Sequence, residues 1–415
     1  MAFETKHVMK TADSPESLVD WLSSFGLSDK GGVNRLLYSK PWVEAQKALK
    51  SQWEEHGLVT SFDSVGNLFG RLEGKESSSC ILTGSHIDSV SNGGKFDGVY
   101  GIIASFSAVQ RLKEAHGAPK KSIEIVSLCE EEGSRFPITF WGSGNITGKY
   151  DISHAEGIKD TQGISLKEAM KSAGFDPQFY QSPARKDIDC FIECHIEQGI
   201  VLERAHKSLG IVSDIVGQKR FTITILGESN HAGTTPMPYR KDSMSAAADI
   251  IHSITGKAIE TDTDLVATIG RLTTSPNAPN VIAGETSFTL DVRHHKQETL
   301  DHFCKEIEDY CSKVARKQDL HISMDKWTDV KPVQMHPQLT RLCEQAAQQQ
   351  DIPYQFMISG AGHDAQMLGT TYPTSLLFVP SCNGISHSPK EFTSAEDLEN
   401  GIEVLTAILY ELAYT

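Results

Sequence analysis

Residues 80–98 read CILTGSHIDSVSNGGKFDG, an apolar run of strand type followed at once by polar and charged side chains. Further apolar runs at residues 123–128, 190–192 and 375–379 end in the same way. Helix-like segments alternate with these runs from about residue 39 onward, as in residues 42–53, where apolar side chains recur at helical spacing. This alternation predicts an α/β fold with a central, mostly parallel sheet.

The pattern changes after about residue 214. Residues 221–225 and 287–292 alternate between apolar and polar side chains, which predicts strands with one solvated face. Amphipathic helices are predicted at residues 244–254 and 300–314. The apolar face of the first helix is expected to carry Met244, Ala247, Ile251 and Ile254. The expected domains are an inserted α+β domain at residues 214–328 and a larger domain formed by residues 1–213 and 329–415.

The charge balance argues against several classes of partner. The chain has 415 residues, with 39 Lys+Arg against 54 Asp+Glu and a net charge of −15. That much negative charge repels phosphate backbones and anionic membranes, so we expect neither nucleic acid nor a membrane as a partner. No uninterrupted apolar run exceeds four residues, and residues 1–14 are largely polar, so we expect a soluble, cytoplasmic protein. The eight cysteines form no CxxC pair and are predicted to be reduced thiols, mostly buried.

Each of the four strand-like runs leads to side chains that could bind a metal ion or move a proton. They are His86 and Asp97 after the first run, Glu130, Glu131 and Glu132 after the second, His195 after the third and His387 after the fourth. Ligands collect at the carboxyl ends of parallel strands in open α/β sheets, so these distant segments can converge on one crevice. Their nitrogen and oxygen donors suit Zn²⁺, Mn²⁺, Co²⁺ or Ni²⁺.

Three histidines, Asp97 and one glutamate of the acidic run are too many ligands for a single open catalytic site. If Asp97 bridges two ions about 3.5 to 4 Å apart, one shell contains His86 and His195, and the other contains a glutamate and His387. A second glutamate would remain free to accept a proton from water. Adjacent side chains point apart on regular backbone, so the run must lie on an irregular turn, which Gly133 would permit. The residues alone do not decide which two glutamates take part.

Each of these features has an ordinary alternative when it is taken singly. A lone histidine is usually a satisfied core or surface residue, and an acidic triplet is usually a solvated loop. Repetition favours the metal site, because separate strands of buried type each end in a ligand with glycines beside them. The motifs HExxH, GxxxxGK[ST] and GxSxG do not occur in the sequence, which argues against the chemistries they serve.

Five motifs stand out in the sequence, and four of them contain candidate ligands. In chain order they are GSHIDS (84–89), GGKFDG (93–98), HIEQG (195–199), HAGTTPM (231–237) and GISHS (384–388). Over nearly the whole chain the sequence resembles the M20 metallopeptidase-like amidohydrolases, in the branch of N-carbamoyl-L-amino-acid hydrolases, β-ureidopropionases and allantoate amidohydrolases. The resemblance implies a metallopeptidase-like catalytic domain and two divalent ions per subunit, Mn²⁺ or Zn²⁺. Carried over residue by residue, it implies Glu131 as general base and, as metal ligands, His86, Asp97 as the bridge, Glu132, His195 and His387.

Further motifs are most similar to those of the allantoate amidohydrolases within this branch. They are EEEGSRFP (130–137), FWGS (140–143), GQKR (217–220), GESNH (227–231) and SGAGHDAQ (359–366). The implied reaction is hydrolysis of the ureido C–N bond of allantoate to ureidoglycine, ammonia and carbon dioxide, in purine nitrogen salvage. The alternative is N-carbamoyl-L-amino-acid hydrolase or β-ureidopropionase-like activity, because a few pocket residues can change the preferred ureido acid. A non-catalytic metal-binding homologue is a more remote alternative.

The resemblance also implies that the inserted domain is a lid through which two chains form a homodimer. His231 would reach the partner subunit's active site to polarise the scissile carbonyl. Arg293 and Asn280 would hold the carboxylate of a small ureido acid, and Gln218 would also contact the substrate. A guanidinium group matches a carboxylate in two-point geometry. The ordinary alternatives are a surface ion pair with Asp291 for Arg293 and a solvent-facing strand residue for Gln218.

Overall fold

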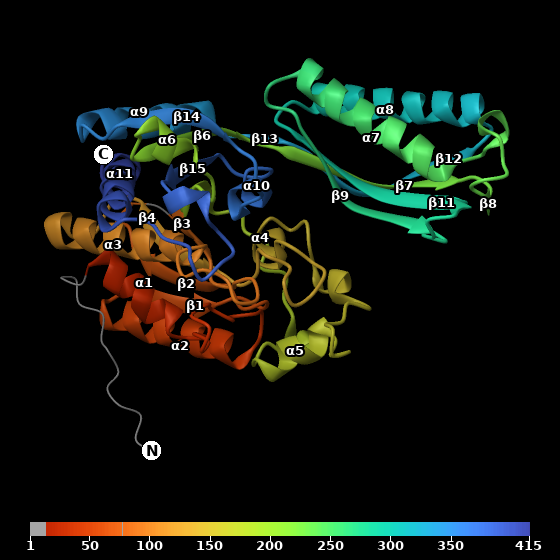
Figure 1. Ribbon diagram of the computed structural model, residues 1–415. Helices are drawn as coiled ribbons and strands as arrows, with labels where there is room; N and C mark the ends of the chain where they lie inside the picture. The colour runs from red at the N-terminus through yellow and green to blue at the C-terminus, as the bar shows by residue number, and fades with distance from the viewer. Residues whose placement is uncertain (1–13, 77) are drawn as a thin grey trace. The chain divides into compact units, whose positions relative to one another are not determined.

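The computed structural model describes residues 14–76 and 78–415 (Figure 1). The chain divides into two compact units. Unit 1 comprises the described residues up to 213 together with 335–357 and 362–415, and unit 2 comprises 214–334 and 358–361. Each unit has its own hydrophobic core.

Unit 1 is built around a sheet whose four central strands are parallel. In spatial order they are β4 (Ser122–Leu128), β3 (Cys80–His86), β5 (Ile188–Ile196) and β15 (Thr374–Val379). The outer strands are β2 (Leu68–Leu72), antiparallel to β4, β1 (Val59–Phe62), antiparallel to β2, and β6 (Leu209–Ile215), antiparallel to β15. Strand β14 (Tyr354–Ser359) also pairs with β6. The predicted α/β class with a central, mostly parallel sheet is confirmed.

Unit 1 also contains helices of varied length. They are α1 (Pro15–Ser23), α2 (Lys40–Glu55), α3 (Val99–His116), α4 (Trp141–Ile146), α5 (Leu166–Ser172), α6 (Val201–Ala205), α9 (Pro337–Gln349), α10 (Asp364–Leu368) and α11 (Ala395–Ala413), with 3₁₀ turns η1 (Ile152–Ala155), η2 (Pro177–Phe179) and η4 (Cys382–Gly384). Helix α3 packs against β3 and α11, and α9, α10 and α11 all contact β15. Every residue of β3, β4 and β15 is buried, as expected for parallel strands covered on both faces.

Helix α2 illustrates how local sequence signals set an element. The Ser39 hydroxyl accepts a hydrogen bond from the backbone N–H of Trp42 at 3.4 Å and caps the helix. Pro41 lies in the first turn, where no N–H is needed. Residues Trp42, Ala45, Leu49 and Trp53 are fully buried at helical spacing. The helix stops before Gly57, which has a φ of +73°.

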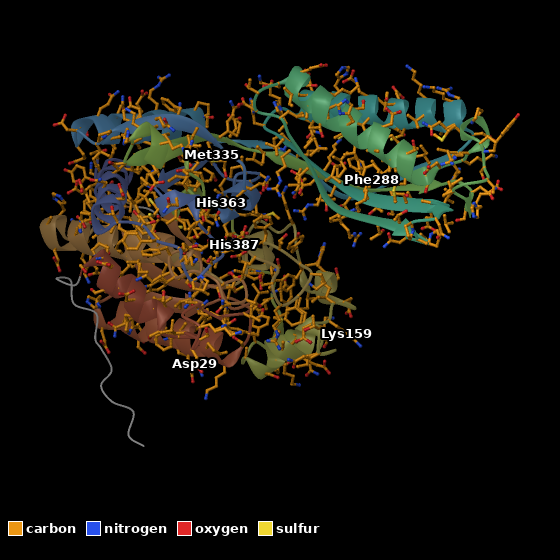
Figure 2. The ribbon with its side chains drawn as sticks, in the orientation of Figure 1. Asp29, Lys159, Phe288, Met335, His363 and His387 are labelled. Atoms are coloured by element: carbon orange, nitrogen blue, oxygen red, sulfur yellow. The ribbon has the colours of Figure 1, made fainter. Side chains whose placement is uncertain are left out.

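Unit 2 is an antiparallel sheet with two helices on one face (Figure 1). Its strands follow the order β12 (His321–Val330), β7 (Gly217–Leu226), β11 (Glu285–His294) and β9 (Val266–Ser275), and its helices are α7 (Ser243–Thr261) and α8 (Gln297–Gln318). Short elements are β8 (Asn230–His231), η3 (Met237–Tyr239), β10 (Val281–Ile282) and β13 (Val333–Gln334). Burial alternates along β7 and β11 as predicted. Figure 2 labels Phe288 of β11, which lies in this core.

The predicted apolar face of α7 is wrong at its first position. Met244 is 44% exposed, whereas Ser243 beside it is buried. The Ser243 hydroxyl donates a hydrogen bond to the carbonyl oxygen of Ala283 at 2.9 Å and therefore turns inward. The buried face continues through Ala247, Ile250 and Ile254.

Two further features were considered from the sequence, which are membrane-spanning helices and the state of the cysteines. Among the described residues, no helix combines the length and the apolar character needed to span a bilayer. All eight cysteines are free thiols, and all but Cys382 are buried. The prediction of reduced, mostly buried thiols is confirmed.

Candidate active site

The candidate ligands of unit 1 lie where its parallel strands end. His86 is the last residue of β3 and pairs in register with Leu128, the last residue of β4. His195 belongs to the end of β5 and pairs with Phe378 of β15. Both histidines are therefore part of the strands themselves, which run further than the apolar runs predicted. This places both imidazoles at one edge of the sheet.

Asp97 lies at the centre of two clusters of possible metal ligands. Its Oδ1 atom is 3.5 Å from Nε2 of His86 and 3.2 Å from Nε2 of His195. Its Oδ2 atom is 3.1 Å from Nε2 of His387, which is 3.5 Å from Oε1 of Glu132. Within each cluster the candidate ligand atoms all lie within 4.8 Å of one another. Asp97 thus directs one oxygen to each cluster, as a carboxylate that bridges two ions would.

The titratable groups of this centre shift one another's pKa values strongly. Burial would raise the pKa of Asp97, but hydrogen bonds from the three histidines outweigh it and hold that pKa well below its usual range. The hydrogen bond to Asp97 raises the pKa of His387 to about 9. Burial raises the pKa of Glu132 to about 7, and its Oε1 atom has no hydrogen-bond partner among the described residues. An all-nitrogen and oxygen donor set with an unsatisfied buried oxygen fits divalent metal ions.

The second ring nitrogen of each buried histidine is already engaged. His195 donates Nδ1–H to the carbonyl oxygen of Ile196 at 2.9 Å. His86 Nδ1 lies 3.2 Å from the carbonyl oxygen of Asp88 and 3.3 Å from its carboxylate. A carbonyl oxygen can only accept, so Nδ1 of each ring carries a proton, and Nε2, which faces Asp97, is the nitrogen left to bind a metal.

The acidic run after β4 lies on irregular backbone, and Gly133 has a φ of +65°. The Asp88 carboxylate accepts hydrogen bonds from the backbone N–H groups of Glu131 at 3.0 Å and Glu132 at 3.2 Å. Glu130 folds back to accept the N–H of Gly133 at 2.5 Å. The three glutamates are thereby separated, and one of them joins the second cluster. Burial raises the pKa of Glu131 well above its usual range.

Two polar residues beside this centre were not predicted from the sequence. Asp88 lies two residues after His86 in the same motif, and that spacing was the available signal. His363, labelled with His387 in Figure 2, is buried with its ring centroid 4.5 Å from that of His195. Burial lowers the pKa of His363 well below its usual value, so the ring is neutral. Only the folded chain brings His363 next to His195.

The predicted substrate residues lie in unit 2. Arg293 donates through Nε and Nη2 to the two oxygens of Asp291, at 3.1 and 3.2 Å, and through Nη1 to the carbonyl oxygen of Gly360 at 2.8 Å. Gln218 pairs in register with Arg293 and donates to Asp291 at 2.8 Å. The ion pair weighed as the ordinary alternative is therefore present, and it holds the guanidinium in a fixed direction.

His231 and Asn280 are brought together by the short strands β8 and β10. His231 pairs with Val281, and the N–H of Ala232 donates to the carbonyl oxygen of Asn280 at 3.0 Å. Nδ1 of His231 accepts hydrogen bonds from the N–H groups of Gly233 at 3.0 Å and Thr234 at 3.2 Å. The proton of the neutral ring therefore sits on Nε2. Both side chains are exposed and available to a ligand.

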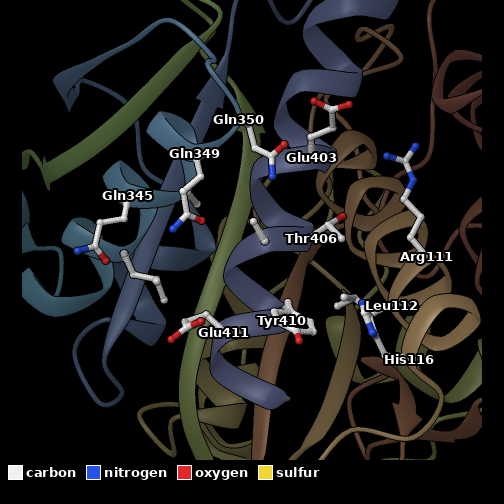
Figure 3. A pocket seen from close by; sticks show the side chains of 13 residues that line it. Arg111, Leu112, His116, Gln345, Gln349, Gln350, Glu403, Thr406, Tyr410 and Glu411 are labelled. Atoms are coloured by element: carbon white, nitrogen blue, oxygen red, sulfur yellow. The ribbon is translucent and has the colours of Figure 1, made fainter. Parts of the chain in front are cut away.

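A groove of unit 1 lies apart from these residues. Figure 3 shows side chains from α3, α9 and α11 around a cavity of about 530 Å³, including Arg111, Gln349 and Tyr410. None of the ligands of either cluster lines it. Arg111 is paired with Glu399 at 2.5 Å. This groove is not the site described above.

A comparison with known families identifies the scaffold. The sequence pattern of peptidase family M20/M25/M40 matches residues 82–411. The chain belongs to this family. M20 enzymes use divalent metal ions, and the two clusters around Asp97 are candidate ligands for them in this M20 chain.

Relatives of this M20 chain are named as amidohydrolases, which hydrolyse C–N bonds. It is 46% identical over 410 residues to allantoate amidohydrolase of Bacillus subtilis (strain 168), covering 99% of this chain and 100% of the relative. It is 44% identical to allantoate amidohydrolase of Escherichia coli (strain K12), covering 96% and 97%. It is 37% identical to N-carbamoyl-L-amino-acid amidohydrolase of Pseudomonas sp. (strain NS671), covering 93% and 95%.

A solved structure has the same fold as this M20 chain. The amidase of the hydantoinase/carbamoylase family from Burkholderia multivorans superposes with a TM-score of 0.91 at 31% identity, covering 97% of each chain. The fold predicted from the motifs is that of solved amidases.

Proposed function

We propose that this chain is an allantoate amidohydrolase, which hydrolyses the ureido C–N bond of allantoate to ureidoglycine, ammonia and carbon dioxide in purine nitrogen salvage. The observation that carries the proposal is the 46% identity, over 99% of the chain, to a relative of that name. The two clusters that share Asp97 support a reaction that depends on two divalent metal ions. Manganese and zinc both suit the donor set.

His86, Asp97 and His195 would hold one ion, and Asp97, Glu132 and His387 the other. When bound, the ions would supply Lewis-acid polarisation and lower the pKa of water. The fixed Nδ1–H groups of His86 and His195 keep both Nε2 atoms directed at Asp97. Asp88 supports the same centre through the backbone of the acidic run.

Glu131 is proposed as the general base. It would take a proton from the attacking water and deliver that proton to the departing nitrogen. Its burial favours the protonated form, which suits a group that must hold a proton between these two steps. Glu130 is engaged with Gly133 and Glu132 with the second cluster, so Glu131 is the member of the run left for this role.

The residues of unit 2 are proposed to bind and polarise the substrate. His231 would donate Nε2–H to the developing oxyanion in the partner subunit's active site. Nδ1 of His231 already accepts two backbone hydrogen bonds, which supports this tautomer. Arg293 and Asn280 would hold the substrate carboxylate, with Gln218 beside them. Asp291 holds Arg293 in place through both carboxylate oxygens.

Unit 2 is also proposed to act as a lid and to join two chains into a homodimer. Strand β9 is at the edge of its sheet, and α7 packs beside it. Val266 and Leu272 on β9 are 54% and 51% exposed, and Ile259 on α7 is 78% exposed. An edge strand with exposed apolar side chains favours association with a second copy. A cytoplasmic location belongs to the same proposal.

The substrate is tested by ammonia release from a panel of ureido acids. The enzyme is reconstituted with Mn²⁺ and then with Zn²⁺, and kcat/KM is measured for allantoate, N-carbamoyl-L-amino acids and β-ureidopropionate. We expect allantoate to be preferred. A higher kcat/KM for N-carbamoyl-L-amino acids would contradict the substrate and favour the alternative that the 37% identical relative supports. Bound metal with no ammonia from any substrate would favour a non-catalytic homologue.

A further inference from the structure

Asp97 belongs to a closed ring of hydrogen bonds. Its proposed role as a bridge between two ions does not by itself require this ring. The ring includes Gln198, which follows β5, and Ser386 and Glu391, which lie in one segment before α11. Gln198 donates Nε2–H to Oδ2 of Asp97 at 3.0 Å and to Oγ of Ser386 at 3.1 Å. Ser386 donates its hydroxyl to Oε2 of Glu391 at 2.7 Å. Glu391 Oε1 accepts the backbone N–H of Asp97 at 3.0 Å, which closes the ring.

Every donor in this ring has a matching acceptor. The amide nitrogen of Gln198 has two hydrogens, and the Asp97 and Ser386 oxygens receive one each. The Ser386 hydroxyl accepts one bond and donates another. Glu391 is buried, with 4% exposure, and accepts both backbone and side-chain donors. The ring therefore fixes Asp97 at its backbone and at its carboxylate together.

Gln198 is held in its place by strained backbone. It lies two residues after the end of β5 and has a φ of +57°, in the left-handed region that non-glycine residues seldom adopt. Its N–H donates to Oγ of Ser381 at 3.0 Å, which secures this conformation. Strained residues of this kind persist where the surrounding structure fixes them, and they gather at functional sites.

Gln198 contacts only one of the two carboxylate oxygens of Asp97. It touches Oδ2 of Asp97, the oxygen that faces His387, and its Nε2 lies 3.4 Å from Nε2 of His387. The other oxygen, Oδ1, faces His86 and His195. A group that orients Oδ2 should therefore act on one cluster and leave the other intact.

We propose that Gln198 is a positioning residue for the second ion, the one held by Asp97, Glu132 and His387. It acts through Asp97 by keeping Oδ2 aimed at that cluster. The proposal rests on the proposed two-metal centre and adds a determinant that distinguishes its two halves.

The test is calorimetric titration of the metal-free, full-length chain with Mn²⁺. We expect the wild type to bind two ions. Gln198→Leu should weaken the affinity for one ion by about 10- to 100-fold, which is the usual effect of losing a residue that orients a ligand. The affinity for the other ion should stay as in the wild type. Gln162→Leu, at an exposed loop position of unit 1, is the matched control and should behave as the wild type.

A reference variant shows which of the two ions is bound more weakly. His387→Ala should lose the second ion, and the double variant Gln198→Leu/His387→Ala should bind the remaining ion as tightly as His387→Ala alone. The positioning role is wrong if Gln198→Leu lowers the affinity for both ions equally, or lowers the affinity for neither ion while the wild type binds two. In both cases the two-metal centre stands. A wild type that binds fewer than two ions would instead overturn the proposed centre.

Folding is checked separately by circular dichroism of the metal-free variants. If Gln198→Leu does not fold, Ser386→Ala replaces it, because it removes the acceptor that holds the second amide hydrogen. Ser386→Ala should also lower the affinity for one ion selectively. If this variant changes the affinities for both ions equally, or changes neither, the proposal is overturned.

Discussion

Glu131 and Glu132 are adjacent in the chain, yet the fold gives them different surroundings. Glu132 lies 3.5 Å from His387 and belongs to the second cluster. Glu131 belongs to neither cluster, and burial raises its pKa. The separation depends on Asp88, which holds both backbone N–H groups on one carboxylate. A base and a ligand can therefore occupy neighbouring positions.

Replacing Glu131 by Gln tests this division of roles. The variant keeps the shape of the side chain but cannot accept a proton, so kcat should fall by about 10² to 10⁴. Metal analysis should still find two ions per chain, because Glu131 is not proposed as a ligand. Glu114→Gln, at an exposed position of α3, is the control. A Glu131→Gln enzyme that keeps most of its activity would show that another group moves the proton.

Arg293 provides a second test at the residue scale. Lysine keeps the charge but cannot make the two-pronged contact, so Arg293→Lys should raise KM for allantoate by about 10-fold or more. Arg316→Lys, exposed on α8, is the matched control. Steady-state kinetics measures the KM of each variant. An unchanged KM for Arg293→Lys would contradict the proposed contact between Arg293 and the substrate carboxylate.

At the scale of elements, β3 and β4 must approach closely to bring their ends together. Gly84 of β3 pairs with Val126 of β4 and has a φ of +150°. A Cβ atom at Gly84 would lie 2.0 Å from the carbonyl oxygen of Val126. Gly84, two residues before His86, is thus needed for the sheet that positions that ligand.

Gly84→Ala should lower the free energy of unfolding by about 2 kcal/mol or more, because the backbone must move to relieve the clash. Gly256→Ala is the opposite case. This glycine lies inside α7, and among the described residues nothing beyond its own helix backbone comes within 4 Å of the Cβ atom that alanine would add. The substitution should stabilise the chain by about 0.5 to 1 kcal/mol. Urea denaturation followed by circular dichroism measures both, and equal stability of the two variants would refute the packing argument.

The central strands and the candidate ligands could be predicted, while the ring around Asp97 could not. Buried parallel strands are apolar throughout, so β3 and β15 are visible in the sequence. Strand β2 contains Gly70 and Arg71 and has no clear pattern, because Gly70 makes room for the ring of Trp53. Met244 was misplaced because the polar Ser243, whose hydroxyl is bonded to Ala283, takes the first place in the buried stripe of α7.

The ring residues show where prediction from sequence stops. Gln198 and Ser386 both fall within the recognised motifs, and Glu391 lies just beyond one of them. Three of the four bonds of the ring join positions 101 to 294 residues apart. A polar side chain in a loop carries no sequence signal for such a distant partner, so only the folded chain reveals the contact.

At the scale of the whole molecule, the proposed homodimer would bring His231 to a neighbouring active site. Sedimentation should give the mass of two chains. Leu272→Asp places a charge on the exposed edge strand β9 and should shift the protein to single chains. Phe179→Asp, at a position of unit 1 that is 79% exposed, is the control and should remain dimeric. A wild type that sediments as a single chain would contradict this interface.

The loss of the dimer should also reduce activity, because His231 is proposed to act in the partner subunit's active site. A monomeric Leu272→Asp variant with full allantoate hydrolysis would show that His231 does not act across an interface. The same sedimentation sample serves for the kinetic assay, so mass and turnover are compared directly.

The central claim is that Asp97 and the four ligand side chains around it hold two divalent ions which the hydrolysis requires. The most direct measurement is ammonia release from allantoate as the metal-free enzyme is titrated with Mn²⁺, with bound metal determined in the same samples. We expect no turnover without metal and full turnover at two ions per chain. Turnover by the metal-free enzyme, or full turnover at one ion per chain, would contradict the claim.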